Sequence, residues 1–218
     1  MPSESKENYL KMLFYLNQKS PNIALTELSN ALQVAKPSAS EMIKKLEKDG
    51  FVASEKYKPI RLTSKGKKAA ASIIRKHRLS EMFLSKFMQF GWEEVHGIAE
   101  EIEHISSEKF FDQMDKLLGF PSTDPHGSPI PNKDGNILKK NYKKLSEFPE
   151  KSTVILKGLK DSSSDFLNYL NKKDIQLNTK IFIDEIEPYD LSFTVSYKDR
   201  KMEVLSLAIC EKLLVISE

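Results

Sequence analysis

Between Leu25 and Thr63 the sequence follows a pattern that few folds accommodate. Two short helical patterns are joined by a tight turn, and the second has Pro37 in its first turn and stops at Gly50, which are common start and stop signals of a helix. Two short strand patterns follow, and an amphipathic helical pattern precedes the pair. Helix, helix–turn–helix and two-stranded hairpin form the winged-helix arrangement, which we therefore expect. The expected elements are helices over 4–18, 25–32 and 37–49 and strands over 51–55 and 60–63.

The rest of the chain divides into a helical part and a β-rich part. Residues 119–150 separate the two and hold five of the ten prolines and three of the eight glycines, which is typical of a connector. Helices are expected over 64–88, 92–105, 107–118 and 165–171, and strands over 153–156, 179–186, 191–197 and 202–205. We therefore expect a mainly α chain with a small β domain at its C-terminal end: a winged helix–turn–helix (1–63), a helical domain (64–120), a connector (121–150) and a small β-barrel (151–218).

Charge is unevenly distributed along the chain. The net charge is only +3, but residues 36–78 contain 13 Lys and Arg against 4 Asp and Glu, whereas residues 79–126 contain 3 against 10. A basic block at a helix–turn–helix indicates a polyanion partner, most often nucleic acid. The acidic block indicates either bound cations or a solvated helix face, and all four histidines (77, 96, 104 and 126) lie in it or next to it.

Other features narrow the class of protein. No apolar run is long enough to cross a bilayer, and the N-terminus lacks the layout of an export signal, so we expect a cytoplasmic protein without a membrane partner. The single cysteine, Cys210, excludes an intrachain disulfide and a multi-cysteine zinc site. We expect Cys210 in the core and Trp92 at the start of a helix.

The second helix of the helix–turn–helix carries the expected DNA contacts, because its N-terminal end faces the major groove in this motif. Ser38 and Glu41 are placed for bases, and Lys44 and Lys45 for phosphates. A solvated lysine face is the alternative, but the hairpin and the basic block favour double-stranded DNA. The expected DNA-binding residues are Lys36, Pro37, Ser38, Ser40, Glu41, Lys44, Lys45, Lys56, Lys58 and Arg61.

The helix expected over 92–105 has two stripes at about 100° per residue. The core stripe is Val95, Ile98, Ala99 and Ile102. The second stripe is His96, Glu100, Glu103 and His104, at i, i+4, i+7 and i+8. Carboxylates this close repel each other unless a cation lies among them, and His77 and Glu81 share one face of the preceding helix. These ligands suit a divalent first-row ion, with Mn²⁺ favoured over Zn²⁺ or Cu²⁺ by the carboxylates. A water-facing stripe is the alternative, and the scarcity of basic residues nearby argues against it.

Four further segments carry a more specific signal: LTSKGKKAA after the hairpin, RKHRLSEMFL, VHGIAEEIEHISSE, and DPHGSPIP in the connector. Together they resemble the diphtheria toxin repressor and manganese transport regulator family of metal-activated repressors, and the resemblance covers essentially the whole chain. It implies a homodimer with Mn²⁺ or Fe²⁺ as co-repressor, a helical domain for metal binding and dimerisation, and an SH3-like C-terminal domain similar to small ferrous-transport accessory proteins.

The resemblance also implies two metal sites. The primary site would take one residue from the first helix and three from the EEIEH segment, here Asn8, Glu100, Glu103 and His104. The ancillary site would fall on His77, Glu81 and His96, joined by Asp124, His126 and either Asp161 or Asp165. Glutamate at position 100, where iron-type members have cysteine, resembles the manganese branch.

Two positions depart from the family pattern. Asn8 stands where the manganese branch has aspartate and the iron branch methionine, so the site should be weaker and its metal preference altered. Lys11 stands where some two-domain manganese members have a second glutamate, which argues for separate primary and ancillary sites rather than a close dinuclear pair.

These observations predict a metal-dependent repressor, not an enzyme, that responds to Mn²⁺ (alternatively Fe²⁺), binds operator DNA as a dimer and controls metal-homeostasis genes. The metal would fix the first helix against residues 100–104, and without it unpaired carboxylates would repel each other. Three alternatives stay open: a winged-helix sensor of a small organic ligand, a carboxylate-bridged metalloenzyme, and a constitutive DNA binder with a structural metal site.

Overall fold

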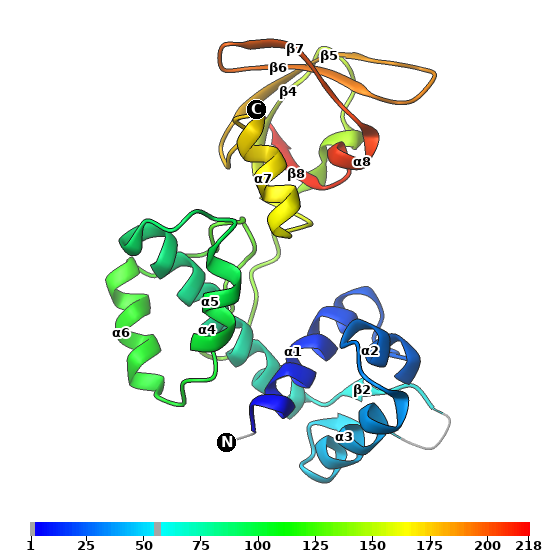
Figure 1. Ribbon diagram of the computed structural model, residues 1–218, viewed down its shortest axis with the longest axis vertical. Helices are drawn as coiled ribbons and strands as arrows, with labels where there is room; N and C mark the ends of the chain where they lie inside the picture. The colour runs from blue at the N-terminus through cyan, green and yellow to red at the C-terminus, as the bar shows by residue number, and fades with distance from the viewer. Residues whose placement is uncertain (1–2, 55–57) are drawn as a thin grey trace. The chain divides into compact units, whose positions relative to one another are not determined.

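The computed structural model describes residues 3–54 and 58–218 (Figure 1). The expected DNA contact of Lys56 lies outside the described residues. The chain divides into two compact units, the first formed by Met1–Ser80, Gly97–Ser122 and Ile130–Leu138 and the second by Glu81–His96, Thr123–Pro129 and Lys139–Glu218. The boundary runs through two helices, so the unit that contains the β-sheet also contains the last turns of the long helix.

The first unit holds the winged helix and most of the helical domain. Its elements are α1 (Glu4–Lys19), α2 (Leu25–Ala31), α3 (Lys36–Lys48), β1 (Val52–Ala53), β2 (Arg61–Leu62), the first part of α4 (Ser64–Met88), most of α5 (Val95–Ile102) and α6 (Glu108–Leu118). In Figure 1, α1, α2 and α3 gather around one core, in which Leu10, Leu13 and Leu46 are fully buried. The helices predicted for α1, α2, α3, α4 and α6 and the described part of the hairpin are confirmed.

The hairpin is held to the helices at both ends. Val52 pairs with Leu62 within it, and Ile60 exchanges two backbone hydrogen bonds with Ile23, which lies just before α2. Thr63 Oγ1 accepts a hydrogen bond from the backbone N–H of Gly66 (3.0 Å) and so caps the first turn of α4. The hairpin therefore continues directly into a fixed helix start.

Gly66 is required by close backbone approach. A Cβ atom at this position would lie 1.9 Å from the carbonyl oxygen of Phe51, at the start of the hairpin. No side chain fits there. The glycine of the LTSKGKKAA segment thus lets α4 pack directly against the hairpin.

Helix α5 is shorter than the predicted 92–105. Before it, the backbone N–H of Gly91 donates to Glu94 Oε2 (2.8 Å) and closes a turn. After it, Lys76 Nζ donates to the carbonyl oxygen of Ile105 (2.8 Å), three residues beyond the last residue of the helix, and so holds this segment against α4. The prediction is therefore wrong by three residues at each end, because contacts that periodicity does not encode fix both ends.

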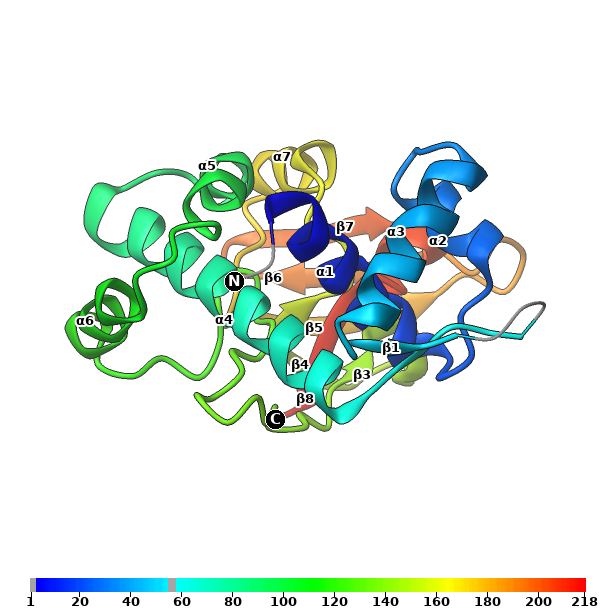
Figure 2. The same cartoon turned by 90° about the horizontal axis from the view of Figure 1, so that it is seen from below.

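The second unit is built on a six-stranded antiparallel sheet in the order β3-β8-β4-β5-β6-β7. Its elements are the end of α4, β3 (Lys143–Lys144), the 3₁₀ helix η1 (Leu145–Glu147), β4 (Thr153–Leu159), α7 (Ser164–Lys172), β5 (Lys180–Ile186), β6 (Phe193–Tyr197), β7 (Arg200–Leu205), α8 (Leu207–Cys210) and β8 (Leu213–Ser217). Figures 1 and 2 both show α7 packed against this sheet. Alternating residues of β4, β5 and β6 point into the core beneath α7.

The expected class, mainly α with a small β domain at the C-terminal end, is confirmed. Four predicted strands and the helix at 165–171 are present, whereas β3, α8 and β8 were not predicted as elements. Cys210 is fully buried in the sheet core, as expected. Across the described residues, no helix combines the length and apolar character that crossing a membrane requires.

Candidate metal sites and nucleic-acid interface

The loop after α6 forms a tight polar turn in the DPHGS sequence. Asp124 Oδ1 accepts hydrogen bonds from the backbone N–H groups of His126 (2.8 Å) and Ser128 (2.9 Å), and the backbone N–H of Asp124 donates to the carbonyl of Ser128 (2.9 Å). Aspartate favours such turns because its short side chain reaches its own backbone. The turn fixes the positions of the Asp124 carboxylate and the His126 ring.

The same loop lies against strand β4 of the second unit. Leu159 donates its backbone N–H to the carbonyl of His126 (3.0 Å). Gly127 has φ +84°, and a Cβ atom there would lie 2.2 Å from the carbonyl oxygen of Lys157. Only glycine satisfies both the left-handed backbone and the close approach.

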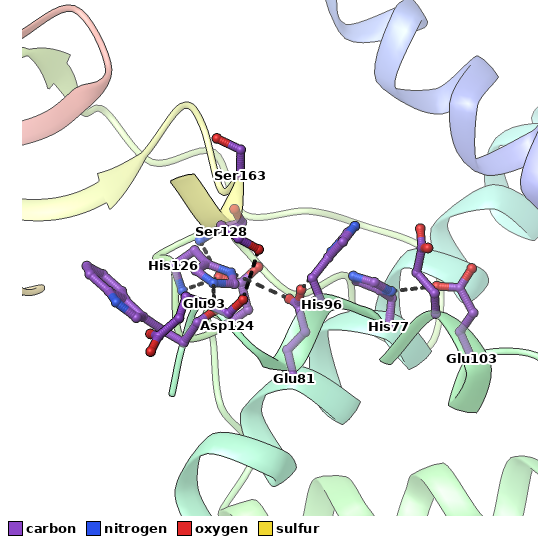
Figure 3. A network of polar contacts seen from close by, with 12 residues as sticks. His77, Glu81, Glu93, His96, Glu103, Asp124, His126, Ser128 and Ser163 are labelled. Carbon is purple, nitrogen blue, oxygen red and sulfur yellow. Dashed lines mark hydrogen bonds and ion pairs between the residues drawn. The ribbon is translucent and has the colours of Figure 1, made fainter. Parts of the chain in front are cut away.

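Glu81, Asp124 and His126 form a buried cluster, whose ligand atoms all lie within 4.8 Å of one another (Figure 3). His126 Nε2 lies 2.8 Å from the carbonyl oxygen of Trp92, so this nitrogen carries the proton and Nδ1 faces Glu81 Oε2 at 3.8 Å. Burial favours the neutral imidazole, but Glu81 and Asp124 together raise the pKa of His126 above its ordinary value.

Glu81 connects this cluster to a second histidine. Its Oε1 lies 3.3 Å from Nδ1 of His96, whose side chain is half exposed. His77 precedes Glu81 by one turn of the same helix α4, on the same face. Two buried carboxylates and an imidazole, with further imidazoles beside them, fit a divalent first-row ion, because burying such carboxylates without a positive partner is unfavourable.

Glu103 is fully buried in the first unit and both of its oxygens have partners. Lys11 Nζ donates to Oε1 (2.6 Å), and His77 Nδ1 lies 2.6 Å from Oε2 (Figure 3 draws the second contact). Burial opposes ionisation, but His77 and Lys11 hold the pKa of Glu103 below its ordinary value. Burial likewise opposes the ammonium, but Glu103 and Glu100 hold the pKa of Lys11 above its ordinary value.

The other members of the predicted primary set lie around this pair. His104 Nε2 lies 3.8 Å from Glu103 Oε1, and Glu100 Oε1 lies 3.3 Å from Lys11 Nζ. Asn8 is exposed and lines a pocket of the first unit together with Lys11 and Glu100. Within the described ranges, Glu100, Glu103 and His104 do not bring three ligand atoms within 4.8 Å of one another.

Two expectations about this region are wrong. His96, Glu100, Glu103 and His104 do not form one helical stripe, because α5 ends at Ile102 and Glu103 turns inward. Nor do the carboxylates lack a basic partner, because Lys11 supplies one from α1.

Glu7 is a residue that the sequence reasoning missed. It is buried, and its Oε2 lies 2.7 Å from His104 Nδ1. The available signal was its place one turn before Lys11, which puts both on one face of α1. Asp161 pairs with Lys212 (2.6 Å), and Asp165 is exposed at the start of α7. Neither belongs to a cluster of three ligand atoms among the described residues.

Among the described residues, the expected DNA contacts lie on one side of α3 and on the hairpin. Ala39, Ile43 and Leu46 are buried and define the inner face of α3, and Ser40 is half-buried. The exposed residues of the predicted set are Lys36, Pro37, Ser38, Glu41, Lys44, Lys45, Lys58 and Arg61. Arg61 Nε donates to Asn22 Oδ1 (2.7 Å), which orients its guanidinium at the base of the hairpin. The outer face of α3 can therefore contact a polyanion without disturbing the core.

Two family models match the sequence: "Iron dependent repressor, N-terminal DNA binding domain" over residues 1–60, and "Iron dependent repressor, metal binding and dimerisation domain" over residues 63–132. The iron-dependent repressor IdeR of Mycobacterium leprae is 28% identical over 178 residues, which are 78% of this chain and 77% of that protein. A manganese-dependent transcriptional repressor in complex with manganese has a TM-score of 0.85 and 28% identity and covers 98% of this chain and 100% of its own. ScaR with bound Zn²⁺ has a TM-score of 0.79 and 32% identity, with full coverage of both chains.

Proposed function

Because this chain belongs to the diphtheria toxin repressor and manganese transport regulator family of metal-dependent transcriptional repressors, we propose that manganese is the ion to which it responds. The buried cluster of Glu81, Asp124 and His126 carries this proposal. Carboxylates and an imidazole without a thiolate favour Mn²⁺ and Fe²⁺ over softer-ligand ions. By the resemblance described above, the glutamate at position 100 favours manganese of the two.

The proposed metal-binding residues fall into two groups. The first is the buried cluster with His96 and His77, and the second is Glu103, His104, Glu100 and Asn8, with Glu7 added from the structure. When bound, the ion supplies the positive charge that draws these carboxylates together. The chain's own residues prepare the first group, since the Asp124 turn and the Trp92 carbonyl orient the His126 ring beforehand.

We further propose that the chain binds operator DNA as a homodimer, through the exposed residues of α3 and the hairpin, at genes of metal homeostasis. The surface of α6 supports self-association. Phe110 and Leu117 are seven residues apart, which places both on one face of that helix, and both are exposed, as is Phe120 just after it. Large exposed apolar side chains grouped on one face are typical of an interface.

A DNA-binding titration tests the proposed function. Duplexes selected by the manganese-loaded protein from a random pool are titrated at fixed salt with Mn²⁺, Fe²⁺, Zn²⁺ or EDTA, because phosphate contacts make the affinity depend on salt. We expect Mn²⁺ to tighten binding by at least about tenfold, a typical allosteric coupling. The variant Asp124→Asn should lose most of this response, whereas Asp112→Asn, at a half-buried position where only a surface pair with Lys133 is lost, should keep it. Equal affinity with Mn²⁺ and with EDTA would leave a constitutive DNA binder and refute the proposal.

A further inference from the structure

We propose that Lys11 is an internal counter-cation of the second group of metal-binding residues. Its ammonium holds Glu103 and Glu100 when no divalent ion is bound, and it competes with that ion for the same carboxylate oxygens. This inference rests on the proposed function, because it concerns how readily the same site takes up its metal.

The contacts place the ammonium between the carboxylates of Glu103 and Glu100. Lys11 Nζ lies 2.6 Å from Oε1 of Glu103 and 3.3 Å from Oε1 of Glu100. His104 Nε2 is 3.8 Å from that same Glu103 oxygen. The second Glu103 oxygen is engaged by His77. The Glu103 oxygen that faces the other candidate ligands is therefore the one that accepts the hydrogen bond from Lys11.

Burial makes this pairing strong. The Glu103 side chain is 0% exposed and the Lys11 side chain 12% exposed. A carboxylate buried to this degree requires a positive partner in every state of the protein, since leaving it unpaired is strongly unfavourable. Lys11 on one oxygen and His77 on the other meet that requirement without metal, so the metal-free protein is not held open by repulsion among bare carboxylates.

A divalent ion and the ammonium cannot share the oxygen. Two cations a few ångströms apart in a half-buried place repel each other strongly. Lysine can withdraw, because its charge sits on a flexible four-carbon stem. Lys11, Asn8 and Glu100 line a pocket of about 620 Å³ in the first unit, which gives the side chain somewhere to move.

The consequence is that a higher concentration of free metal ion is needed to fill the site. Every ion that binds Glu103 must first break the contacts of Lys11, so the lysine lowers the apparent metal affinity by the strength of those contacts. The same contacts connect α1, which belongs to the winged helix, to the turn after α5. Lys11 therefore keeps these two elements together before metal arrives.

The test compares metal affinity and metal-free stability in three full-length variants. In Lys11→Gln we expect roughly tenfold tighter Mn²⁺ binding by calorimetry, the effect of removing one close charge pair. The same variant should melt at a lower temperature without metal and gain more from added Mn²⁺ than the wild type. Lys6→Gln is the matched control, because it removes another lysine of α1, paired with Asp49, and should leave Mn²⁺ affinity unchanged. Lys11→Arg should bind Mn²⁺ more weakly than the wild type, because guanidinium holds a carboxylate more firmly.

The outcomes separate this inference from the proposed function. If the wild type binds Mn²⁺ and Lys11→Gln binds it equally or more weakly, the inference is overturned and the proposed function stands. If Lys11→Gln fails to fold, Lys11→Arg decides: affinity equal to or tighter than the wild type overturns the inference, and weaker affinity supports it. A wild type that neither binds Mn²⁺ nor changes its DNA affinity with it overturns both.

Discussion

His77 Nδ1 lies 2.6 Å from Glu103 Oε2, so a residue expected in the ancillary site holds one expected in the primary site. Both side chains are buried, and the contact links α4 to the turn that follows α5. Under the proposed function, a metal ion that binds Glu103 would change the hydrogen-bond partner of His77. The two candidate sites therefore share a hydrogen bond, and binding at one is expected to alter binding at the other.

The first prediction concerns Glu103→Gln. The amide leaves Lys11 and His77 without the charge that they contact, and breaking a buried pair by removing one partner costs about 3 kcal/mol of unfolding free energy. Urea unfolding of the metal-free protein measures this loss. Glu101→Gln, on the exposed side of α5, is the control and should change the unfolding free energy by less than about 0.5 kcal/mol. Equal losses in both variants would show that Glu103 is not the buried anchor described above.

The second prediction compares two glycines with nearly the same backbone angle. Gly127 has φ +84° and no room for a Cβ atom, whereas Gly119 has φ +77° and open space around it. We expect Gly119→Ala to lower the unfolding free energy by about 1 kcal/mol, from backbone strain alone. Gly127→Ala should cost about 3 kcal/mol, because the loop must also move away from Lys157. It should also weaken Mn²⁺ binding, since Asp124 and His126 move with the loop; the same Mn²⁺ affinity in both alanine variants would argue against a metal site there.

The third prediction concerns the α6 surface. Leu117 is 59% exposed on the face shared with Phe110, and a glutamate in its place should oppose self-association. Sedimentation should show Leu117→Glu as a monomer at concentrations where the wild type is a dimer. Leu138→Glu serves as the control, because Leu138 is 69% exposed but lies outside α6. A dimer that survives Leu117→Glu would place the interface elsewhere.

The fourth prediction uses the single thiol of the chain. Burial raises the pKa of Cys210 to about 12, from an ordinary value of 9.0. At pH 8 the folded protein therefore has about a thousandfold less thiolate than the unfolded chain, and a disulfide reagent should react correspondingly slowly until denaturant is added. Equally fast reaction with and without denaturant would show that Cys210 is accessible in the native state.

The same shift affects stability at alkaline pH. Above pH 9 the unfolded chain loses the Cys210 proton while the folded chain keeps it until about pH 12, so the unfolded state is favoured as pH rises through this window. Cys210→Ala removes this contribution, so its unfolding free energy should fall less steeply above pH 9 than that of the wild type. Parallel slopes for the two proteins would contradict the buried, neutral thiol.

Periodicity and capping signals were sufficient for the winged helix and the long helix, because these elements are stabilised by local patterns. They were not sufficient for α5, because the segments on either side of it are held by the side-chain contacts of Glu94 and Lys76 rather than by the helix pattern. Strand β8 was missed because LLVIS is a continuous apolar run, which periodicity cannot assign to strand or helix.

The candidate sites likewise contain some residues that the sequence indicates and others that only the folded chain brings together. Asp124 and His126 came from the resemblance, and the structure brings both to Glu81. The pairing of Lys11 with Glu103 joins residues 92 positions apart, so no local pattern announces it. Glu7 was passed over for its neighbour Asn8, because only the packed helix shows which of the two faces His104.

The hydrogen bond from Leu159 to the carbonyl of His126 fastens to the β-sheet the loop that carries two of the proposed metal-binding residues. A protein truncated before residue 151 would still contain Glu81, Asp124 and His126. It would lack strand β4, which holds the main-chain carbonyl of His126. Under the proposed function, removal of the C-terminal sheet should therefore weaken metal binding while the winged helix keeps its fold.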